Sequence, residues 1–182
     1  MKNKIINAKI FRAKVTNKTS WLFLKLENEI GIIGWGEATL QGKEKEVFEI
    51  SEQIFNLILN KNYSSPYDLK KYLPFRNISE ASLSSAIMQC LWDIKGKLEQ
   101  QSIGTIFGKK HNQIKTYANF NRSTTDRTLK GIKTRVKTVL NDGFKLIKFA
   151  PFDEVLLGMT SKEIRIAMQL GLERINIIKE NA

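Results

Sequence analysis

The sequence predicts an α+β domain, in which helices cover an antiparallel meander, followed by a region where strands and helices alternate. Three observations lead to this prediction. Apolar residues alternate with polar ones over the first 37 residues, recur at helical spacing from residue 43 to about 98, and then form strand and helix patterns in turn. With 182 residues and 42% hydrophobic content, the chain can bury one good core or two small ones.

The meander is predicted from three short runs. "KIINAKIF" alternates Ile6, Ala8 and Ile10, and "WLFLKLE" places Leu22, Leu24 and Leu26 on one face. "IGIIGWGE" follows after the turn residues 27–29, so the three runs read as consecutive antiparallel strands.

Two long helices are expected next. One spans residues 43–60, with the apolar face Val47, Ile50, Ile54, Leu57 and Ile58. The other begins near Ser79 and turns inward Leu83, Ile87, Cys90, Leu91 and Ile94. Gly96 lies within this helix, where glycine costs up to about 1 kcal/mol, so we expect close packing there.

The last 70 residues read as a strand, helix, strand unit. "KTYANF" is a strand, 125–141 is an amphipathic helix ended by Gly143, and "KLIKFA" is a second strand. Thr160 and Glu163 form a capping box that opens a further helix, with Gly171 as its possible interruption.

Composition limits the function classes. The net charge of +12 suggests nucleic-acid binding, but the lysines are spread singly or in pairs with no basic tail, so a solvated surface is preferred. The N-terminal sequence lacks the apolar core of a signal peptide, and no apolar run approaches the roughly 20 residues of a membrane span. We therefore expect a cytoplasmic protein with no membrane or nucleic-acid partner, and we interpret the lone Cys90 as a buried structural thiol.

Four segments carry a family resemblance. "GIIGWGEATL" at 31–40, "SSAIMQCLWDIKGKLEQQSIGTIFG" at 84–108, "TYANF" and "GFKLIKFAPFD" occur in the order and spacing typical of one family. The chain resembles the N-terminal part of the enolase superfamily, in its mandelate racemase and muconate lactonizing enzyme branch. The resemblance implies a capping domain over residues 1–112, and the first two strand-helix units of an incomplete α/β barrel over 113–182.

The same resemblance implies a function for the parent protein. Such enzymes are magnesium-dependent lyases or isomerases that remove the proton next to a carboxylate of a small-molecule substrate, and they are commonly homo-oligomers. Their metal ligands lie on the third to fifth barrel strands, beyond Ala182, so we expect no metal site, no cofactor and no turnover for this chain alone. "KFAPFD" suggests an acid-sugar dehydratase as the parent.

Lys148 is the one catalytic candidate. By the resemblance, Lys148 and residue 150 correspond to a Lys-x-Lys pair at the end of the second barrel strand, where the second lysine is usually the base. Residue 150 is alanine, so Lys148 keeps at most a supporting role as a charge contact for a substrate carboxylate. The alternative is that Lys148 pairs with a protein carboxylate or reaches water.

Polar residues at strand ends and in capping loops are the substrate-binding candidates. They are Asn17, Thr19, Thr39, Gln41, Asn119 and Asn121. Turn formation and plain surface loops are the alternative interpretations. We interpret Trp92 and Asp93 as helix-packing residues, His111 as exposed, and Asp153 with Glu154 as a loop or helix start.

Two further hypotheses stay open. The chain could be a non-catalytic binding or assembly protein that keeps the capping fold, or a basic nucleic-acid binder whose affinity would fall with salt.

Overall fold

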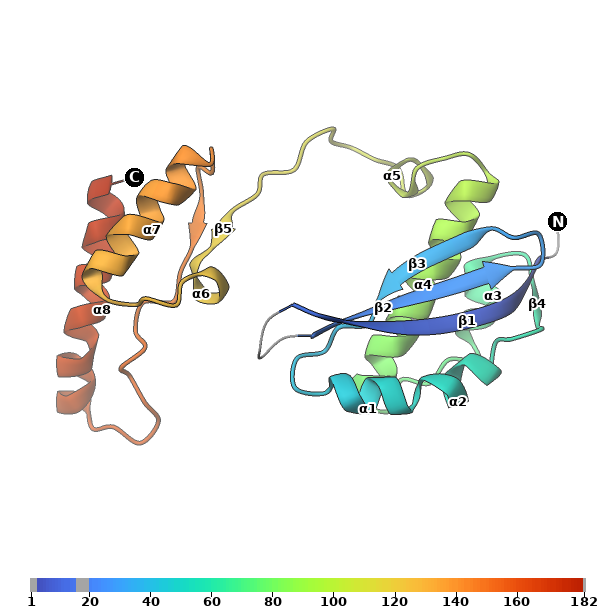
Figure 1. Cartoon of the computed structure of the whole chain (residues 1–182), viewed down its shortest axis with the longest axis horizontal. Helices are drawn as coiled ribbons and strands as arrows, with labels where there is room; N and C mark the ends of the chain where they lie inside the picture. Colours follow the sequence, from blue (N-terminus) through green and yellow to red (C-terminus); the bar gives the residue numbers. More distant parts are fainter. Residues whose placement is uncertain (1–2, 16–19, 182) are drawn as a thin grey trace. The chain divides into compact units, whose positions relative to one another are not determined.

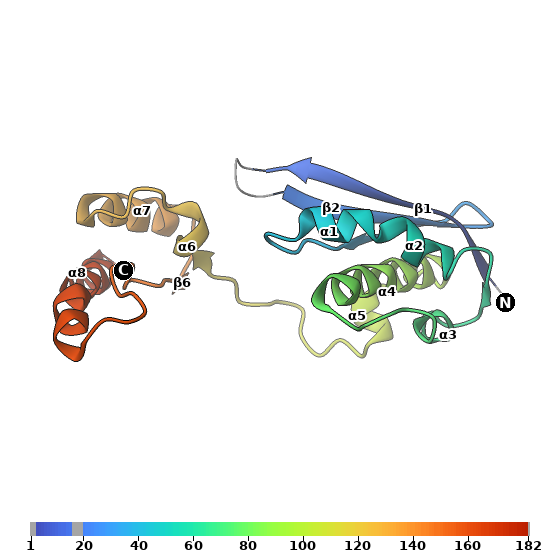
Figure 2. The same ribbon diagram turned by 90° about the horizontal axis from the view of Figure 1, so that it is seen from below.

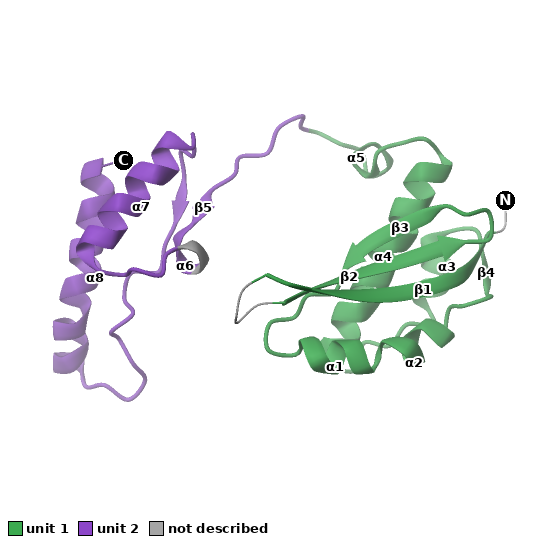
Figure 3. Cartoon of the chain, viewed as in Figure 1, with its two compact units in different colours: residues 1–110 green, residues 111–182 purple. Residues whose placement is uncertain are grey.

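The computed structural model describes residues 3–15 and 20–181, except for the side chains of residues 122 and 123. The chain folds into two compact units, residues 1–110 (unit 1) and residues 111–182 (unit 2), each with its own core (Figures 1 and 3).

Unit 1 contains a four-stranded sheet in the order β3-β2-β1-β4, with all neighbours antiparallel. The strands are β1 (Asn3–Lys14), β2 (Ser20–Asn28), β3 (Ile33–Glu37) and β4 (Asn62–Tyr63). The predicted inward leucines of β2, Leu22, Leu24 and Leu26, are fully buried. The meander is therefore confirmed, including the face that it buries.

The predicted inward face of β1 is wrong at its start. Ile5 is fully buried, whereas Ile6 is 49% exposed. The pairing with β2 shifts register between Ile5 and Asn7, which inserts a bulge. Because side chains alternate strictly along a strand, one extra residue moves the preceding apolar position to the other face. Beyond the bulge, Ala8 and Ile10 pack against the core as predicted.

The expected helix over 43–60 is two short helices, α1 (Glu44–Glu49) and α2 (Ser51–Asn56). At the junction the Ser51 hydroxyl donates a hydrogen bond of 2.7 Å to the Phe48 carbonyl. Such local side-chain bonds compete with the regular helical ladder, so the helix breaks there. Leu57, predicted to face inward, lies after the end of α2 and is 38% exposed.

The helix α4 (Ile78–Leu98) is the centre of unit 1, with α3 (Pro66–Lys70) before it and α5 (Ile103–Ile106) after it. The Asn77 side chain caps its first turn by accepting from the Glu80 amide at 2.9 Å. All five residues predicted to face inward are fully buried: Leu83, Ile87, Cys90, Leu91 and Ile94. At Gly96 an added Cβ would lie 2.9 Å from the Gln101 carbonyl oxygen, so the predicted close packing is confirmed.

Polar side chains of α4 close the free edge of β3. Asp93 accepts from the Trp35 amide at 2.9 Å, and Gln89 accepts from the Glu37 amide at 3.0 Å. Lys97 donates to the Ile33 carbonyl at 2.7 Å and to Asp93 at 2.8 Å. Residues four apart share one helix face, so positions 89, 93 and 97 act as a substitute for a neighbouring strand. The predicted packing role of Asp93 is this edge contact.

Unit 2 places two short parallel strands against helices (Figure 1). The elements are β5 (Ala118–Asn119), α6 (Phe120–Ser123), α7 (Leu129–Asn141), β6 (Ile147–Lys148) and α8 (Ser161–Asn181). The predicted strands exist but pair over only two residues each. Ala118, Phe120, Ile132, Val136 and Val139 form the buried core of this unit.

Helix ends in unit 2 follow their capping residues. α7 begins at Leu129 rather than Thr125, because the Thr128 hydroxyl accepts from the Gly131 amide at 3.1 Å while Asp126 accepts from the Thr128 amide at 3.0 Å. Gly143, at φ +86°, ends α7 as predicted.

The helix α8 also follows its cap. The capping box is confirmed, since Glu163 accepts from the Thr160 amide at 2.8 Å. Gly171 does not interrupt α8, which is continuous from Ser161 to Asn181. The α+β capping unit followed by the first two strand-helix units of a barrel is the fold that the sequence predicted.

Candidate functional site

Lys148 lies on the side of the β5–β6 pair that faces away from the helices. Its neighbours Ile147 and Phe149 both pack into the core of unit 2, so strand alternation directs Lys148 the opposite way. Asn119 is its partner across the parallel pair, and Lys148 is exposed. We call this surface, with Asn119 and Lys148, the Lys148 face.

The Lys148 ammonium lies 5.6 Å from the centre of the Tyr117 ring. A lysine over an aromatic face gains roughly 0.5–1 kcal/mol at an exposed site, so this contact orients the side chain only weakly. Lys148 therefore reaches water and presents an exposed positive charge at the carboxyl end of β6.

Ala150 fixes the backbone just beyond Lys148. Its amide donates to Asn121 Oδ1 at 2.7 Å, and its carbonyl accepts from Arg127 Nη2 at 2.6 Å. Both contacts use main-chain groups, and the side chain is a methyl group. The second position of the Lys-x-Lys pattern thus offers no proton acceptor.

The two asparagines after β5 have local structural contacts. The Asn119 side chain accepts from the Asn121 amide at 3.1 Å and caps α6. Asn121 ties the end of β5 to the segment after β6 through its bond to Ala150. These contacts match the turn-forming alternative, and a role toward a substrate stays a prediction.

The capping-loop candidates belong to unit 1. Asn17 and Thr19 lie outside the described residues. Thr39 is half-buried, and its hydroxyl accepts from the Leu22 amide at 3.0 Å, which anchors the chain after β3. Gln41 is exposed. Their predicted role as substrate contacts stays a prediction.

Two arginines that the sequence interpretation missed hold the loop after Lys148. Arg174 of α8 is only 3% exposed and donates to both oxygens of Glu154, at 2.8 and 2.6 Å, and to the Pro151 carbonyl at 2.7 Å. Arg127 donates to both oxygens of Asp153, at 2.6 and 2.7 Å. We call these four charged side chains the arginine clasp.

The clasp perturbs its acids in the direction expected for paired carboxylates. The hydrogen bond from Arg127 holds the pKa of Asp153 below its usual value, and the bond from Arg174 does the same to the pKa of Glu154. These acids form the loop that was expected after the second strand. Nothing in the spacing of Asp153 and Glu154 pointed to Arg127, 26 positions before Asp153, or to Arg174, 20 positions after Glu154.

An open cavity of about 520 Å³ adjoins the clasp. It is lined by Asn121, Thr124, Arg127, Ala150, Asp153, Glu154 and Arg174. The Thr124 hydroxyl and Arg127 Nη1 are buried there without a hydrogen-bond partner. The Arg127 guanidinium carbon lies 4.7 Å from the centre of the Phe149 ring.

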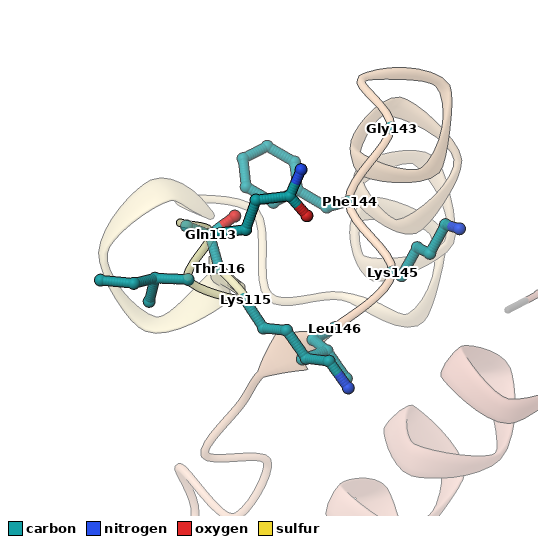
Figure 4. A pocket seen from close by; sticks show the side chains of 8 residues that line it. Gln113, Lys115, Thr116, Gly143, Phe144, Lys145 and Leu146 are labelled. Carbon is teal, nitrogen blue, oxygen red and sulfur yellow. The ribbon is translucent and has the colours of Figure 1, made fainter. Parts of the chain in front are cut away.

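A second cavity, of about 540 Å³, lies at the other end of the strands (Figure 4). Residues 113–116 and 143–146 line it, and these segments precede β5 and β6. Parallel barrel enzymes place their chemistry at the carboxyl ends of the strands, so this position does not suit a catalytic site.

Other titratable candidates have structural surroundings. Cys90 is fully buried, and burial raises the pKa of its thiol to about 12, so it stays a protonated packing group. His111 is exposed. Trp92 contacts Tyr67 and Phe107, with ring centres 5.5 and 4.6 Å apart, which agrees with its predicted packing role.

Within residues 3–15 and 20–181, no group of three His, Cys, Asp or Glu side chains is placed to hold a metal ion. In the same part of the chain, no helix combines the length and apolar character needed to cross a membrane.

The fold and the Lys148 face define the class of protein, in which an α+β capping unit is followed by the first strands of a parallel α/β barrel. Residues 7–108 match the family model described as "Mandelate racemase / muconate lactonizing enzyme, N-terminal domain". The chain therefore belongs to this family.

Solved structures show the same fold. A candidate dehydratase from Mesorhizobium loti is 23% identical with a TM-score of 0.81, over 98% of this chain and 50% of that one. A member of the enolase superfamily from Salmonella Typhimurium is 19% identical with a TM-score of 0.80, over 98% of this chain and 52% of that one. A candidate galactarate dehydratase from Agrobacterium radiobacter, bound to sodium and L-malate, is 18% identical with a TM-score of 0.80, over 98% and 45%. The chain spans about half the length of these proteins.

Proposed function

We propose that this chain is the capping domain and the first two barrel units of a magnesium-dependent lyase or isomerase that acts on a small carboxylate substrate. An acid-sugar dehydratase is the favoured reaction, with a domain boundary after residue 112 and a cytoplasmic location. One observation carries the proposal: Asn119 and Lys148 are paired at the carboxyl ends of two parallel strands, on the side away from the helices. Chemistry in parallel barrels is placed at that end of the strands.

The role of Lys148 follows from its charge and exposure. An exposed ammonium group attracts a carboxylate, and a substrate carboxylate held there is oriented rather than activated. Since Ala150 supplies no base, Lys148 acts as a contact and does not remove a proton. The six polar candidates of the sequence keep their proposed part as substrate contacts.

Magnesium does not fit the residues that the structure describes, because it needs several oxygen ligands and those residues supply no converging group of acids. In the proposed enzyme the magnesium ligands come from further strands of the parent protein, and the isolated chain has no turnover.

Lysine methyl NMR tests the substrate contact. With all lysines dimethylated using ¹³C, we expect addition of L-malate to shift the Lys148 signal, which a Lys148→Met variant identifies. Lys145, an exposed lysine at the amino end of the same segment, is the internal control and should not respond. An equal response at both lysines, or none at 50-fold excess over protein, contradicts the proposed contact.

Sequencing of the gene beyond codon 182 tests the assignment to a larger enzyme. A continuation that encodes acids at the ends of three successive strands supports it, whereas a continuation without such acids contradicts it.

A further inference from the structure

Tyr117 borders the Lys148 face and presents its ring to solvent. The next residue, Ala118, is buried in the core of unit 2, so strand alternation turns Tyr117 and Asn119 to the side on which Lys148 lies. The helices α7 and α8 lie together on the other side of the β5–β6 pair (Figures 1 and 2). Neither helix covers Tyr117, which is 50% exposed.

The Tyr117 ring is the neighbour of the Lys148 ammonium group, with 5.6 Å between the nitrogen and the ring centre. Among the residues that the structure describes, no ion pair includes Lys148. Lys25, Lys95 and Lys97, by contrast, each pair with an acid. An aromatic ring, and not a carboxylate, therefore orients the ammonium group of Lys148.

This kind of neighbour leaves the charge of Lys148 available to a ligand. A protein carboxylate would neutralise the ammonium group and compete with an incoming anion, whereas a ring attracts the cation through its quadrupole and carries no net charge. Lysine also has a long flexible stem, and fixing such a side chain at the moment of binding costs free energy. A ring that restricts the stem beforehand lowers this cost.

We infer that Tyr117 is a positioning residue, whose ring holds the Lys148 ammonium group where a substrate carboxylate meets it. The inference rests on the proposed function, because it requires that Lys148 contacts the substrate. The face of the ring supplies the attraction, so phenylalanine at position 117 should serve equally well and an aliphatic side chain should not.

Proton shifts of the full chain with ¹³C-dimethylated lysines test the placement without any ligand. Dimethylation keeps the positive charge, and a Lys148→Met variant identifies the Lys148 signal. The ring current of Tyr117 should move this signal upfield. We expect Tyr117→Leu to return the signal to the position of Lys145, an exposed lysine, and Tyr117→Phe to keep the upfield shift. The inference is wrong if Tyr117→Leu leaves the Lys148 signal unmoved, or if Tyr117→Phe also loses the shift.

Titration with L-malate tests the consequence for binding. The strength of an exposed cation–π contact corresponds to a change of about two- to fivefold in affinity, so Tyr117→Leu should raise the Kd measured at Lys148 by this factor. Tyr117→Phe should keep the Kd of the parent chain. An equal Kd in the parent chain and in Tyr117→Leu overturns the positioning role while the substrate contact of Lys148 stands.

The two measurements separate a failure of the inference from a failure of the proposed function. If malate shifts no lysine of the parent chain although Tyr117→Leu moves the Lys148 signal, the substrate contact is wrong and the placement of the ammonium group by Tyr117 is supported.

Discussion

Replacing Gly34 with alanine is expected to destabilise unit 1 strongly, because β3 and α4 touch through main-chain atoms at this point. A Cβ built on Gly34 would lie 2.1 Å from the Cys90 carbonyl oxygen and 2.8 Å from Ile94 Cγ1. Real Cβ contacts essentially never fall under 3.0 Å, so strand and helix must separate by about 1 Å.

That separation also affects the closed edge of β3. The bonds from the Trp35 amide to Asp93, at 2.9 Å, and from Lys97 to the Ile33 carbonyl, at 2.7 Å, would stretch beyond hydrogen-bonding distance. Overpacking costs about 1–3 kcal/mol and each lost bond about 1 kcal/mol. Alanine lowers the conformational entropy of the unfolded chain relative to glycine, which stabilises the folded state by about 0.4–1 kcal/mol. The net loss is roughly 3 kcal/mol, a large part of the 5–15 kcal/mol typical of a domain.

Urea unfolding followed by tryptophan fluorescence measures this loss, because all three tryptophans, Trp21, Trp35 and Trp92, belong to unit 1. Gly104→Ala is the matched control, since its added Cβ would have its nearest contact at an ordinary 3.5 Å. We expect the control to stay within about 0.5 kcal/mol of the parent. A Gly34→Ala protein within 1 kcal/mol of the parent refutes the reasoning.

Three further predictions concern charge and chemistry. The pKa values of Asp153 and Glu154 are lower in the folded chain than their unfolded values of 3.8 and 4.5. The two ionised acids therefore stabilise unit 2 fully above these unfolded values, and this stabilisation is lost as the pH falls through the lower folded values. Far-UV circular dichroism should show this acid transition. An Arg174→Met variant with the same transition would contradict the claim that the arginine clasp causes it. Cys90, with a pKa of about 12, should react with a thiol reagent at pH 8 only after unfolding, and rapid reaction of the folded chain counts against its burial. Calorimetry should find no stoichiometric magnesium site of micromolar affinity. Neither the parent chain nor an Ala150→Lys variant should turn over hydroxy acids, and activity in either protein argues against the proposed function.

Periodicity was enough to predict the buried side of unit 1. The five residues of α4 and the three leucines of β2 are fully buried because one face of each element meets one core. The failures are single-residue events that a period cannot show. A bulge placed Ile6 outside, and the Ser51 hydroxyl divided a helix that the apolar spacing predicted as continuous.

The candidate site was predicted in part. The place of Lys148 at the end of the second strand followed from the family resemblance, whereas the contacts that hold its surroundings did not. The clasp joins residues 127, 153, 154 and 174, whose association depends on how three elements pack. Long-range charge pairing leaves no regular spacing in one sequence, so tertiary contacts had to reveal it.

The clasp explains how the loop after β6 keeps one shape although β5 and β6 pair over only two residues each. Arg174 is almost wholly buried, and its ion pair with Glu154 and its hydrogen bond to the Pro151 carbonyl join α8 to this loop. On the same helix, a Cβ at Gly171 would lie 2.3 Å from Phe152 Cδ1, so helix and loop are also in direct contact. All of these contacts are made inside unit 2. The backbone that carries Lys148 is thus held in place by contacts within unit 2.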